Sequence, residues 1–579
     1  MRENTAGTPR IRYEPNEKPG WPLSVALGLQ SAVPVLVGTV VVSVITARTG
    51  SAGEPYVIWA VFAALVVGGL TTVLQSVRVG RLGAGHAMAM VSSGSFIAAS
   101  ATALRLGGPG LLASLVLASS CLQIALANRL SGLRRLLTPT VCGTIIMLIP
   151  AAVLPIAFAM LGNTPPDTPG HAVSVCFAVT LLVITVLTLR GSAAIRIWAP
   201  LIGIAAGSLA SIPLDLHDFG RVAAADWVGV PTAGWPAVAP SFGPRFWALL
   251  PAFLFVALVN TMKTIGDATA LQAASWRTAR APDYRVAEGA VAASGVGNLL
   301  CAVAGVMPNV AYSASASAVH LTGVAARRVG VCIGAVLLAL AFCPKVVAVL
   351  LSVPDAVISA YLVVLFGLLF VGGVEMAVSE GMNLRRATII GISFWMGVGF
   401  GQGAIVPGDS SSLWVTLLTD GISVGALTAL VCTGFVELTG PRPRHLTTVL
   451  DADAAPRIEA FLSRLADRSG WGDRSKDRLV GVAEEVLLLL LGEVGSRDKT
   501  ASSSLRLTAR AGSGSTELEF VVAAGDTNIE DQLALLAGPA GTPREEDVSL
   551  RLLRHYARTV RHRKYHSVDI VTVAVDSHA

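Results

Sequence analysis

The feature that most constrains the fold is a series of apolar runs, each about 20 residues long, between residues 22 and 437. A helix of that length spans the hydrocarbon core of a bilayer. Hydrophobic residues make up 53% of the chain and charged residues 14%. Because only helices and closed barrels satisfy their backbone polar groups in lipid, this pattern predicts an all-α polytopic membrane protein.

We expect fourteen spans, preceded by a cytoplasmic tail at 1–21 that lacks the features of a secretory signal. On that count, twenty Arg and Lys residues up to Arg444 lie in inner segments and five lie in outer loops. This bias predicts that both termini are cytoplasmic. The expected spans lie near 22–46, 57–76, 82–103, 109–128, 138–161, 172–189, 197–214, 247–270, 286–306, 309–323, 329–351, 354–374, 387–405 and 412–437.

Several classes of protein are disfavoured by the same sequence. All seven cysteines fall inside apolar runs, without metal-ligand spacing, so we expect neither a metal site nor a cofactor. The net charge is +6, but the basic residues are spread over short loops instead of forming one stripe, so the charge does not indicate nucleic-acid binding. There is no Ser/His/Asp constellation or phosphate loop, so we expect no catalytic residues and no enzyme.

Two of the expected spans are poor helices. The stretches 83–96 and 308–317 are rich in Gly, Ser or Pro and short of large apolar side chains. Seven spans separate them, the offset that a 7+7 inverted repeat produces, and interrupted spans at matching positions indicate a binding site at the midplane. Their exposed backbone N–H groups would then become ligand donors.

The eighth expected span carries two ionisable residues, Lys263 and Asp267. Because they lie four residues apart on a helix, they could form an internal ion pair without any ligand. Alternatively, the Lys263 ammonium faces a cavity, where it would favour an anionic or carbonyl-rich substrate or would itself titrate.

The tenth expected span offers Asn309, Tyr312, Ser313 and Ser315. These side chains could simply satisfy a broken helix, but hydroxyls coincide there with exposed backbone, which favours a binding role. Tyr312 could stack on a flat heterocycle, and the serines could form short hydrogen bonds. In the first span, Gln30 could form an interhelical hydrogen bond or face the cavity.

These motifs together resemble the nucleobase/ascorbate transporters, also called xanthine/uracil permeases. The resemblance covers roughly residues 12–440 and implies a core domain and a gate domain. In this family the third and tenth spans begin as short strands that meet at the midplane and hold a planar base against the eighth span. The matching segments are Leu27–Gln30, Met90–Phe96, Pro139–Gly143, Thr264–Asp267, Gly295–Leu300, Pro308–Asn309, Tyr312–Ser313, Leu321–Val324 with Arg327–Arg328, and Phe366–Gly367.

The chain departs from the family at the positions that matter for the ligand. Proton-coupled members usually carry Glu where this chain has Lys263, and a Glu or Gln followed by Asn where it has Ala314 and Ser315. Proton or cation coupling therefore stays open. The candidate substrate-binding residues, including two that the resemblance adds in the third span, are Gln30, Ser93, Phe96, Lys263, Asp267, Asn309, Tyr312, Ser313, Ala314 and Ser315.

The composition changes after the permease region, which we place at 22–440. A linker at 441–452 leads into 453–579, which has charged, soluble character. Helical patterns at 454–467, 475–495 and 546–562 and strand patterns at 503–510, 516–523 and 567–575 predict a cytoplasmic α/β two-layer domain.

This C-terminal region faintly resembles the histidine-kinase-type ATPase fold of anti-sigma factors. Leu488 or Leu489 stands where that fold has its Mg-ATP Asn, and no Asp-x-Gly-x-Gly occurs. The resemblance therefore implies a degenerate domain that binds no ATP and has a regulatory or protein-interaction role. A cytoplasmic domain of the sulfate-transporter type is the rival fold.

Three functions are compatible with the sequence. The first is a plasma-membrane secondary transporter for nucleobases such as xanthine, urate or uracil, with an elevator-type mechanism and, as is common in the family, a homodimeric state. The second is an anion transporter of the same fold, which Lys263 favours. The third is a membrane sensor that signals through the C-terminal domain to a cytoplasmic protein partner.

Overall fold

The structure is a computed structural model of the chain. It describes residues 11–127, 129, 138–162, 169, 171–214, 219–231, 234–236, 240–277, 280–379, 381–403, 421–439, 443–451, 453–494, 504–511, 515–523, 529, 545–566 and 568–576. The chain divides into two compact units. The first contains residues 1–275 and 286–433, and the second contains 276–285 and 434–579.

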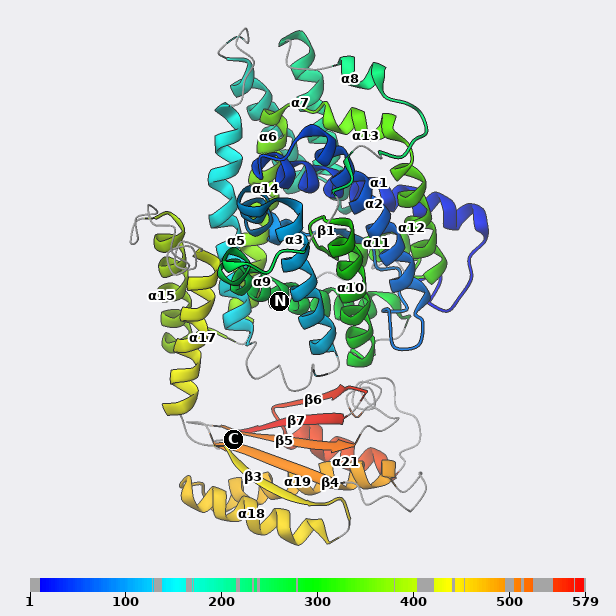
Figure 1. The fold of residues 1–579 in the computed structure, drawn as a ribbon. Coiled ribbons are helices and arrows are strands. Elements are labelled where there is room, and N and C mark those ends of the chain that lie inside the picture. The colour runs from blue at the N-terminus through cyan, green and yellow to red at the C-terminus, as the bar shows by residue number, and fades with distance from the viewer. Residues whose placement is uncertain are drawn as a thin grey trace. The chain divides into compact units, whose positions relative to one another are not determined.

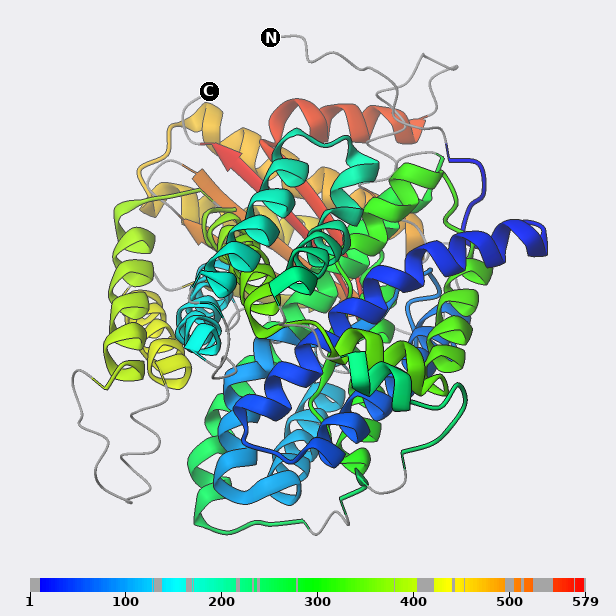
Figure 2. The same ribbon diagram turned by 90° about the horizontal axis from the view of Figure 1, so that it is seen from above.

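The first unit is built almost entirely of helices (Figure 1). They are α1 (Trp21–Thr49), α2 (Glu54–Val77), α3 (Ile97–Ala127), α5 (Pro139–Ala159), α6 (Ala172–Arg190), α7 (Ala193–Ser211), α8 (Phe219–Ala224), α9 (Pro244–Ser275), α10 (Tyr284–Ala304), α11 (Ala314–Thr322), α12 (Arg327–Ala341), α13 (Pro344–Leu351), α14 (Asp355–Val378), α15 (Leu384–Gly401) and α17 (Gly421–Thr439). Both views show α15 and α17 side by side (Figures 1 and 2), and the backbones of Gly397 and Gly421 meet there.

Many of these helices match the expected membrane segments. Within the described residues, eight helices are long and apolar enough to cross a bilayer, and α12 with α13, which meet at 83°, would make a ninth. The expected span 82–103 is an irregular stretch with β1 (Met90–Ser92) and η1 (Gly94–Phe96) that leads into the first turns of α3, and the expected span 109–128 is the remainder of α3. The two parts of α3 are separated by a break at Gly108 (φ 65°, ψ −166°) and Pro109. Glycine tolerates this conformation because it has no Cβ. The chain is therefore a mostly helical, multi-pass membrane protein.

Two helices of the first unit follow very short strands. β1 (Met90–Ser92) precedes the 3₁₀ turn η1 (Gly94–Phe96) and α3, and β2 (Asn309–Ala311) precedes α11. The strands pair antiparallel, with Val91 opposite Val310. The Gly- and Ser-rich sequence around β1 and Pro308 before β2 disfavour a continuous helix at these points.

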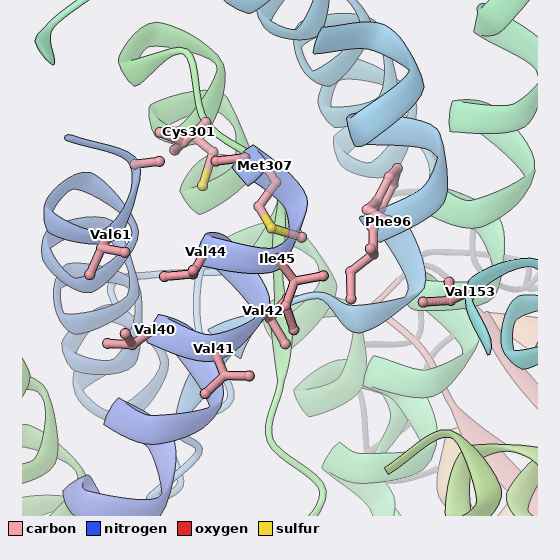
Figure 3. Packing of buried hydrophobic residues seen from close by; sticks show 14 of the residues in the cluster. Val40, Val41, Val42, Val44, Ile45, Val61, Phe96, Val153, Cys301 and Met307 are labelled. Atoms are coloured by element: carbon pink, nitrogen blue, oxygen red, sulfur yellow. The ribbon is translucent and has the colours of Figure 1, made fainter. Parts of the chain in front are cut away.

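The interior of the first unit is packed with medium-sized apolar side chains. Figure 3 shows α1 contributing Val40, Val41, Val44 and Ile45 to a buried cluster that also includes Phe96. Elsewhere glycine lets helix backbones touch. A Cβ on Gly373 of α14 would lie 2.9 Å from the Met147 nitrogen and 3.0 Å from the Gly143 oxygen, both in α5. Such close contacts are typical of helix packing in membranes.

The second unit contains a five-stranded antiparallel sheet in the order β3-β4-β5-β7-β6. Three helices lie on one face of it (Figure 1), and they enclose a core with β7 residues Val571, Val573 and Val575. The strands are β3 (Arg444–Val449), β4 (Ser504–Ala511), β5 (Ser515–Ala523), β6 (Thr559–Lys564) and β7 (Val568–Asp576), and the helices are α18 (Ala454–Arg468), α19 (Asp473–Val494) and α21 (Glu545–Tyr556).

Two strands of this sheet differ from the expected pattern. Residues 444–449, expected within a linker, form β3 and pair with β4. The expected helix at 546–562 ends at Tyr556, and β6 follows it. The β6 sequence, Thr-Val-Arg-His-Arg-Lys, lacks the alternation of apolar and polar residues by which a strand is recognised, because its inward positions are occupied by His562 and Lys564.

Candidate functional site

The site is built around the pairing of β1 with β2. Beyond the strands, the Ser93 nitrogen donates to the Pro308 oxygen at 2.9 Å, and the Tyr312 nitrogen donates to the Ala89 oxygen at 2.9 Å. These bonds satisfy backbone groups that a broken helix would otherwise leave unpaired in a membrane. The pairing leaves η1 with α3 on one side and α11 on the other, each starting directly after its strand. Helix N-termini carry partial positive charge, so this region favours electron-rich groups of a ligand.

Buried amide side chains hold the two strands in place. The Asn298 side-chain oxygen on α10 accepts a hydrogen bond from the Asn309 nitrogen at 2.8 Å, and the Asn298 side-chain nitrogen donates to Gln123 at 2.9 Å. On α9, the Asn260 side-chain nitrogen donates to Ser93 Oγ at 2.7 Å. These bonds fix the strands to helices α3, α9 and α10.

Lys263 joins α9 to the start of α11. Its Nζ donates to Asp267 Oδ2 at 2.8 Å, to the Ala311 oxygen at 2.7 Å and to Ser313 Oγ at 2.8 Å. Ser313 Oγ in turn donates to Asp267 Oδ2 at 3.2 Å. An ammonium has three N–H groups, so these three acceptors match all of them. The Lys263 and Asp267 side chains, 24% and 16% exposed, form an ion pair with no net charge.

A cavity of about 200 Å³ lies beside this arrangement. It contains four of the sequence-predicted residues: Gln30, Tyr312, Ala314 and Ser315. Most of the remaining wall is apolar or small. It is formed by Leu27, Ser31, Pro34, Ala87, Ala89, Trp198, Ala318, Val319, Leu321, Thr322, Val324, Val329 and Ile333.

The amide and hydroxyl groups of this cavity come from two segments of the chain. Gln30 lies on α1, while Tyr312 and Ser315 lie on the segment that contains β2 and α11. Ser315 Oγ accepts a hydrogen bond from the Ala89 nitrogen at 3.3 Å, so it links the two interrupted spans. Trp198 extends the wall from α7. The cavity thus combines flat apolar surface with an amide and hydroxyl groups, a composition suited to a small polar heterocycle.

The other six predicted residues do not line this cavity. Ser93 and Asn309 are buried at the strand crossing, and Phe96 packs against Phe253 with ring centroids 5.4 Å apart. Lys263, Asp267 and Ser313 form the neighbouring hydrogen-bonded cluster. The structure therefore places the predicted residues in two adjoining groups, one facing the cavity and one supporting the segments that form it.

Several residues of this region were missed by sequence reasoning. Asn298 belongs to the matching segment Gly295–Leu300 but is not among the candidate residues, although a polar side chain in an apolar span usually faces a partner inside the bundle. Asn260 begins the polar stretch 260–267 that contains Lys263 and Asp267, but it is not among the candidate residues either. Trp198 gave no signal, because its position depends on how α7 packs.

A second cavity, of about 350 Å³, shares no lining residue with the first. It lies between α3, α5, α9, α15 and α17, and it contains Thr102, Arg105 and Gln402. None of the predicted substrate-binding residues lines it. Phe96 and Ile97, which precede its Ala98 and Ala99, are fully buried in the core.

Comparisons with known proteins find similar permeases. The family model described as "Permease family" matches residues 23–405. A protein named as a purine permease from Clostridium perfringens is 30% identical over 71% of this chain and 89% of its own length. Xanthine permease XanP of Escherichia coli K12 is 27% identical over 63% of this chain and 82% of its own. Uric acid permease PucK of Bacillus subtilis is 26% identical over 73% and 97%.

The family match covers most of the first unit, where the two interrupted spans and the cavity lie. The resemblance seen in the sequence motifs is thereby confirmed, and so is the expectation of a transporter rather than an enzyme. The chain belongs to the nucleobase/ascorbate transporter family of permeases.

Proposed function

We propose that this permease carries purine or pyrimidine bases such as xanthine, urate or uracil across the plasma membrane. The observation that carries the proposal is the cavity beside the paired strands β1 and β2, lined by Gln30, Tyr312 and Ser315. The relatives named as permeases of xanthine, uric acid and purines support the same substrate class.

The cavity suggests how such a base is held. The Tyr312 ring offers a face for stacking on a planar heterocycle. The Gln30 amide can both donate to a ring carbonyl and accept from a ring N–H. Leu27, Val319 and Ile333 supply apolar wall against the remaining surface of the base. Ala314 leaves room where a larger side chain of the family would reach the base.

Lys263 supports the pocket in this proposal rather than binding the substrate as a free cation. Its charge is balanced by Asp267, and its N–H groups are engaged by Asp267, Ala311 and Ser313. An anion would have to compete with a carboxylate already in place. This geometry favours a base held by stacking and hydrogen bonds in the cavity over an inorganic anion held by a free ammonium, which the alternative of an anion transporter of the same fold would need.

The architecture that we propose has fourteen spans in two inverted repeats of seven. The pairing of β1 with β2 supports it, since these strands begin the expected third and tenth spans. The break of α3 at Gly108 separates the expected third and fourth spans. We further propose a core domain that moves against a gate domain by an elevator-type mechanism. Both termini are proposed to be cytoplasmic, and the protein is proposed to be a homodimer. If transport is driven by protons or another cation, the Lys263–Asp267 pair is the candidate coupling group.

The C-terminal region, residues 453–579, is proposed to be a cytoplasmic regulatory domain of degenerate ATPase type. The antiparallel sheet that it forms together with β3 (Arg444–Val449), with helices on one face, supports an α/β two-layer arrangement. A cytoplasmic protein partner would act through this domain.

Uptake into proteoliposomes tests the proposed substrate class. The purified protein should accumulate radiolabelled xanthine, urate or uracil, and unlabelled base should compete, whereas sulfate and bicarbonate should not enter. Gln30→Ala should lower uptake by about tenfold, because one good hydrogen bond to the base is lost. Leu29→Ala, a change at the adjacent α1 residue outside the cavity lining, is the control. Uptake of sulfate or bicarbonate alone would support the anion alternative, and base binding without uptake would indicate a sensor.

A further inference from the structure

The second unit is formed by two separate parts of the chain, the short segment 276–285 and the C-terminal region. This segment connects α9 to α10. Inside the unit it lies against the end of β6. Tyr284 and Tyr565 have ring centroids 5.2 Å apart, and the Arg563 guanidinium lies 5.7 Å from the centre of the Tyr284 ring.

The backbone of the segment also joins the sheet. Asp283 forms a parallel bridge with Lys564 of β6. β6 is an edge strand, and edge strands are the surfaces on which extended segments add to a sheet. Tyr565 and Lys564 are only 2% and 3% exposed. This edge is therefore already covered, and the segment that covers it is the connection between α9 and α10.

The segment connects α9 and α10, the two helices whose side chains hold β2 and the start of the tenth expected span in place. α9 ends at Ser275 and carries Lys263, which bonds to the Ala311 oxygen and Ser313 at the start of α11. α10 begins at Tyr284 and carries Asn298, which accepts from the Asn309 nitrogen in β2. A displacement of the segment would therefore act on both helices that position β2 and α11.

We propose that the C-terminal domain acts as a clamp on Asp283 and Tyr284 and restrains α9 and α10, the helices that this segment connects, and with them the substrate site. The contacts of the clamp do not depend on the proposed transport function, but the effect of the clamp on uptake rests on it. A restraint on an element that must move stabilises one state over the others. Fixing the clamp should slow transport, and loosening it should speed transport.

A reversible cross-link tests the restraint in the full-length protein. In the variant Tyr284→Cys/Arg563→Cys, a short, cleavable bis-maleimide should join the two positions, as peptide mass analysis would show. The control pair Arg510→Cys/Glu517→Cys joins cross-strand neighbours of β4 and β5 and leaves the segment untouched. We expect the first cross-link to lower base uptake by about threefold or more, with recovery on cleavage, and the second to leave it unchanged.

A matched pair of single substitutions tests the opposite direction. Arg563→Ala removes the guanidinium above Tyr284 and should raise the uptake rate by about twofold to threefold. Arg561→Ala removes the same charge from the same strand, two residues away and on an exposed position, and should have no effect. Both proteins should show unchanged thermal unfolding of the C-terminal domain, which separates loosening of the clamp from misfolding.

Hydrogen exchange in residues 309–322 gives a readout that needs no substrate. It should slow in the cross-linked clamp, quicken in Arg563→Ala and stay constant in both controls. If wild-type protein transports no base but exchange responds in this way, the proposed substrate is wrong and the clamp stands. If the cross-link fails to form, or forms without changing either uptake or exchange, the clamp is overturned.

Discussion

Lys263 shows how an ammonium group can be held within a membrane segment. Its three N–H groups meet a carboxylate, a backbone carbonyl and a hydroxyl, so the desolvation cost is offset locally. Asp267 belongs to α9, Ala311 ends β2, and Ser313 directly precedes α11. The residue therefore ties an intact helix to an interrupted one, which is a structural role that an anion-binding lysine would not need.

Removing one partner of the Lys263–Asp267 pair should destabilise the protein more than removing both partners. Lys263→Gln leaves Asp267 without its countercharge and should destabilise the protein by about 2 kcal/mol, less than for a fully buried pair because both side chains keep some exposure. The double variant Lys263→Gln/Asp267→Asn should recover most of that loss. Thermal unfolding in detergent measures both. Equal destabilisation by the single and double variants would show that the pair is not coupled. Unchanged uptake and pH dependence in Lys263→Gln would exclude a coupling role for the lysine.

The residues that line the first cavity include no Asp, Glu, Lys, Arg or His among the described part of the chain. Ala314→Glu should therefore introduce a new pH dependence of base uptake. A carboxyl group can take up or release a proton where an amide cannot, so the charge in the cavity would then depend on pH. Uptake measured between about pH 5 and 8 should change across that range. Ala314→Gln, with similar shape and no titration, should keep the wild-type profile, and identical profiles for the Glu and Gln variants would contradict the expectation.

At the scale of helices, α5 and α14 approach so closely that glycine is required. Gly373→Ala would place a Cβ 2.8 Å from Met147 Cγ and 2.9 Å from the Met147 nitrogen, so the helices must separate. We expect a loss of about 1–3 kcal/mol, seen as a lower unfolding temperature. Gly372→Ala, one residue earlier, meets nothing within 4 Å and should be neutral or slightly stabilising. Similar behaviour of the two variants would mean that the α5–α14 contact does not limit stability.

The interrupted elements could be expected from local chemistry, whereas others could not. Gly, Ser and Pro around 83–96 and 308–317 disfavour a continuous helix, and short strands occur there. β6 escaped prediction because its buried His562 and Lys564 are held by tertiary surroundings, with the Ile529 nitrogen donating to His562 Nδ1 at 3.0 Å. In the same way, Tyr312 and Ser315 follow from the break, but Trp198 reaches the cavity only through the packing of α7.

For the molecule as a whole, the membrane class and the family followed from apolar run lengths and ordered motifs, and both are confirmed by the matches over residues 23–405. The attachment of residues 276–285 to the C-terminal sheet could not be foreseen. That loop carries no apolar pattern typical of a strand, and its bridge to β6 depends on a strand that was itself missed. Long-range pairing of this kind is invisible to local periodicity.

The C-terminal domain should bind no ATP, which separates a degenerate regulatory module from a working nucleotide site. On α19, Leu488 is 56% exposed where the ATPase fold that the sequence faintly resembles would place an Asn that serves Mg²⁺, and a leucine has no oxygen to offer the metal. Equilibrium binding of labelled ATP to the full-length protein, with and without Mg²⁺, should therefore show no saturable component. Glu484→Ala, which alters the glutamate four residues before Leu488, is the matched control and should give the same background. Saturable Mg²⁺-dependent binding that disappears in Glu484→Ala would show that the domain is an active nucleotide site and that the permease is regulated by ATP.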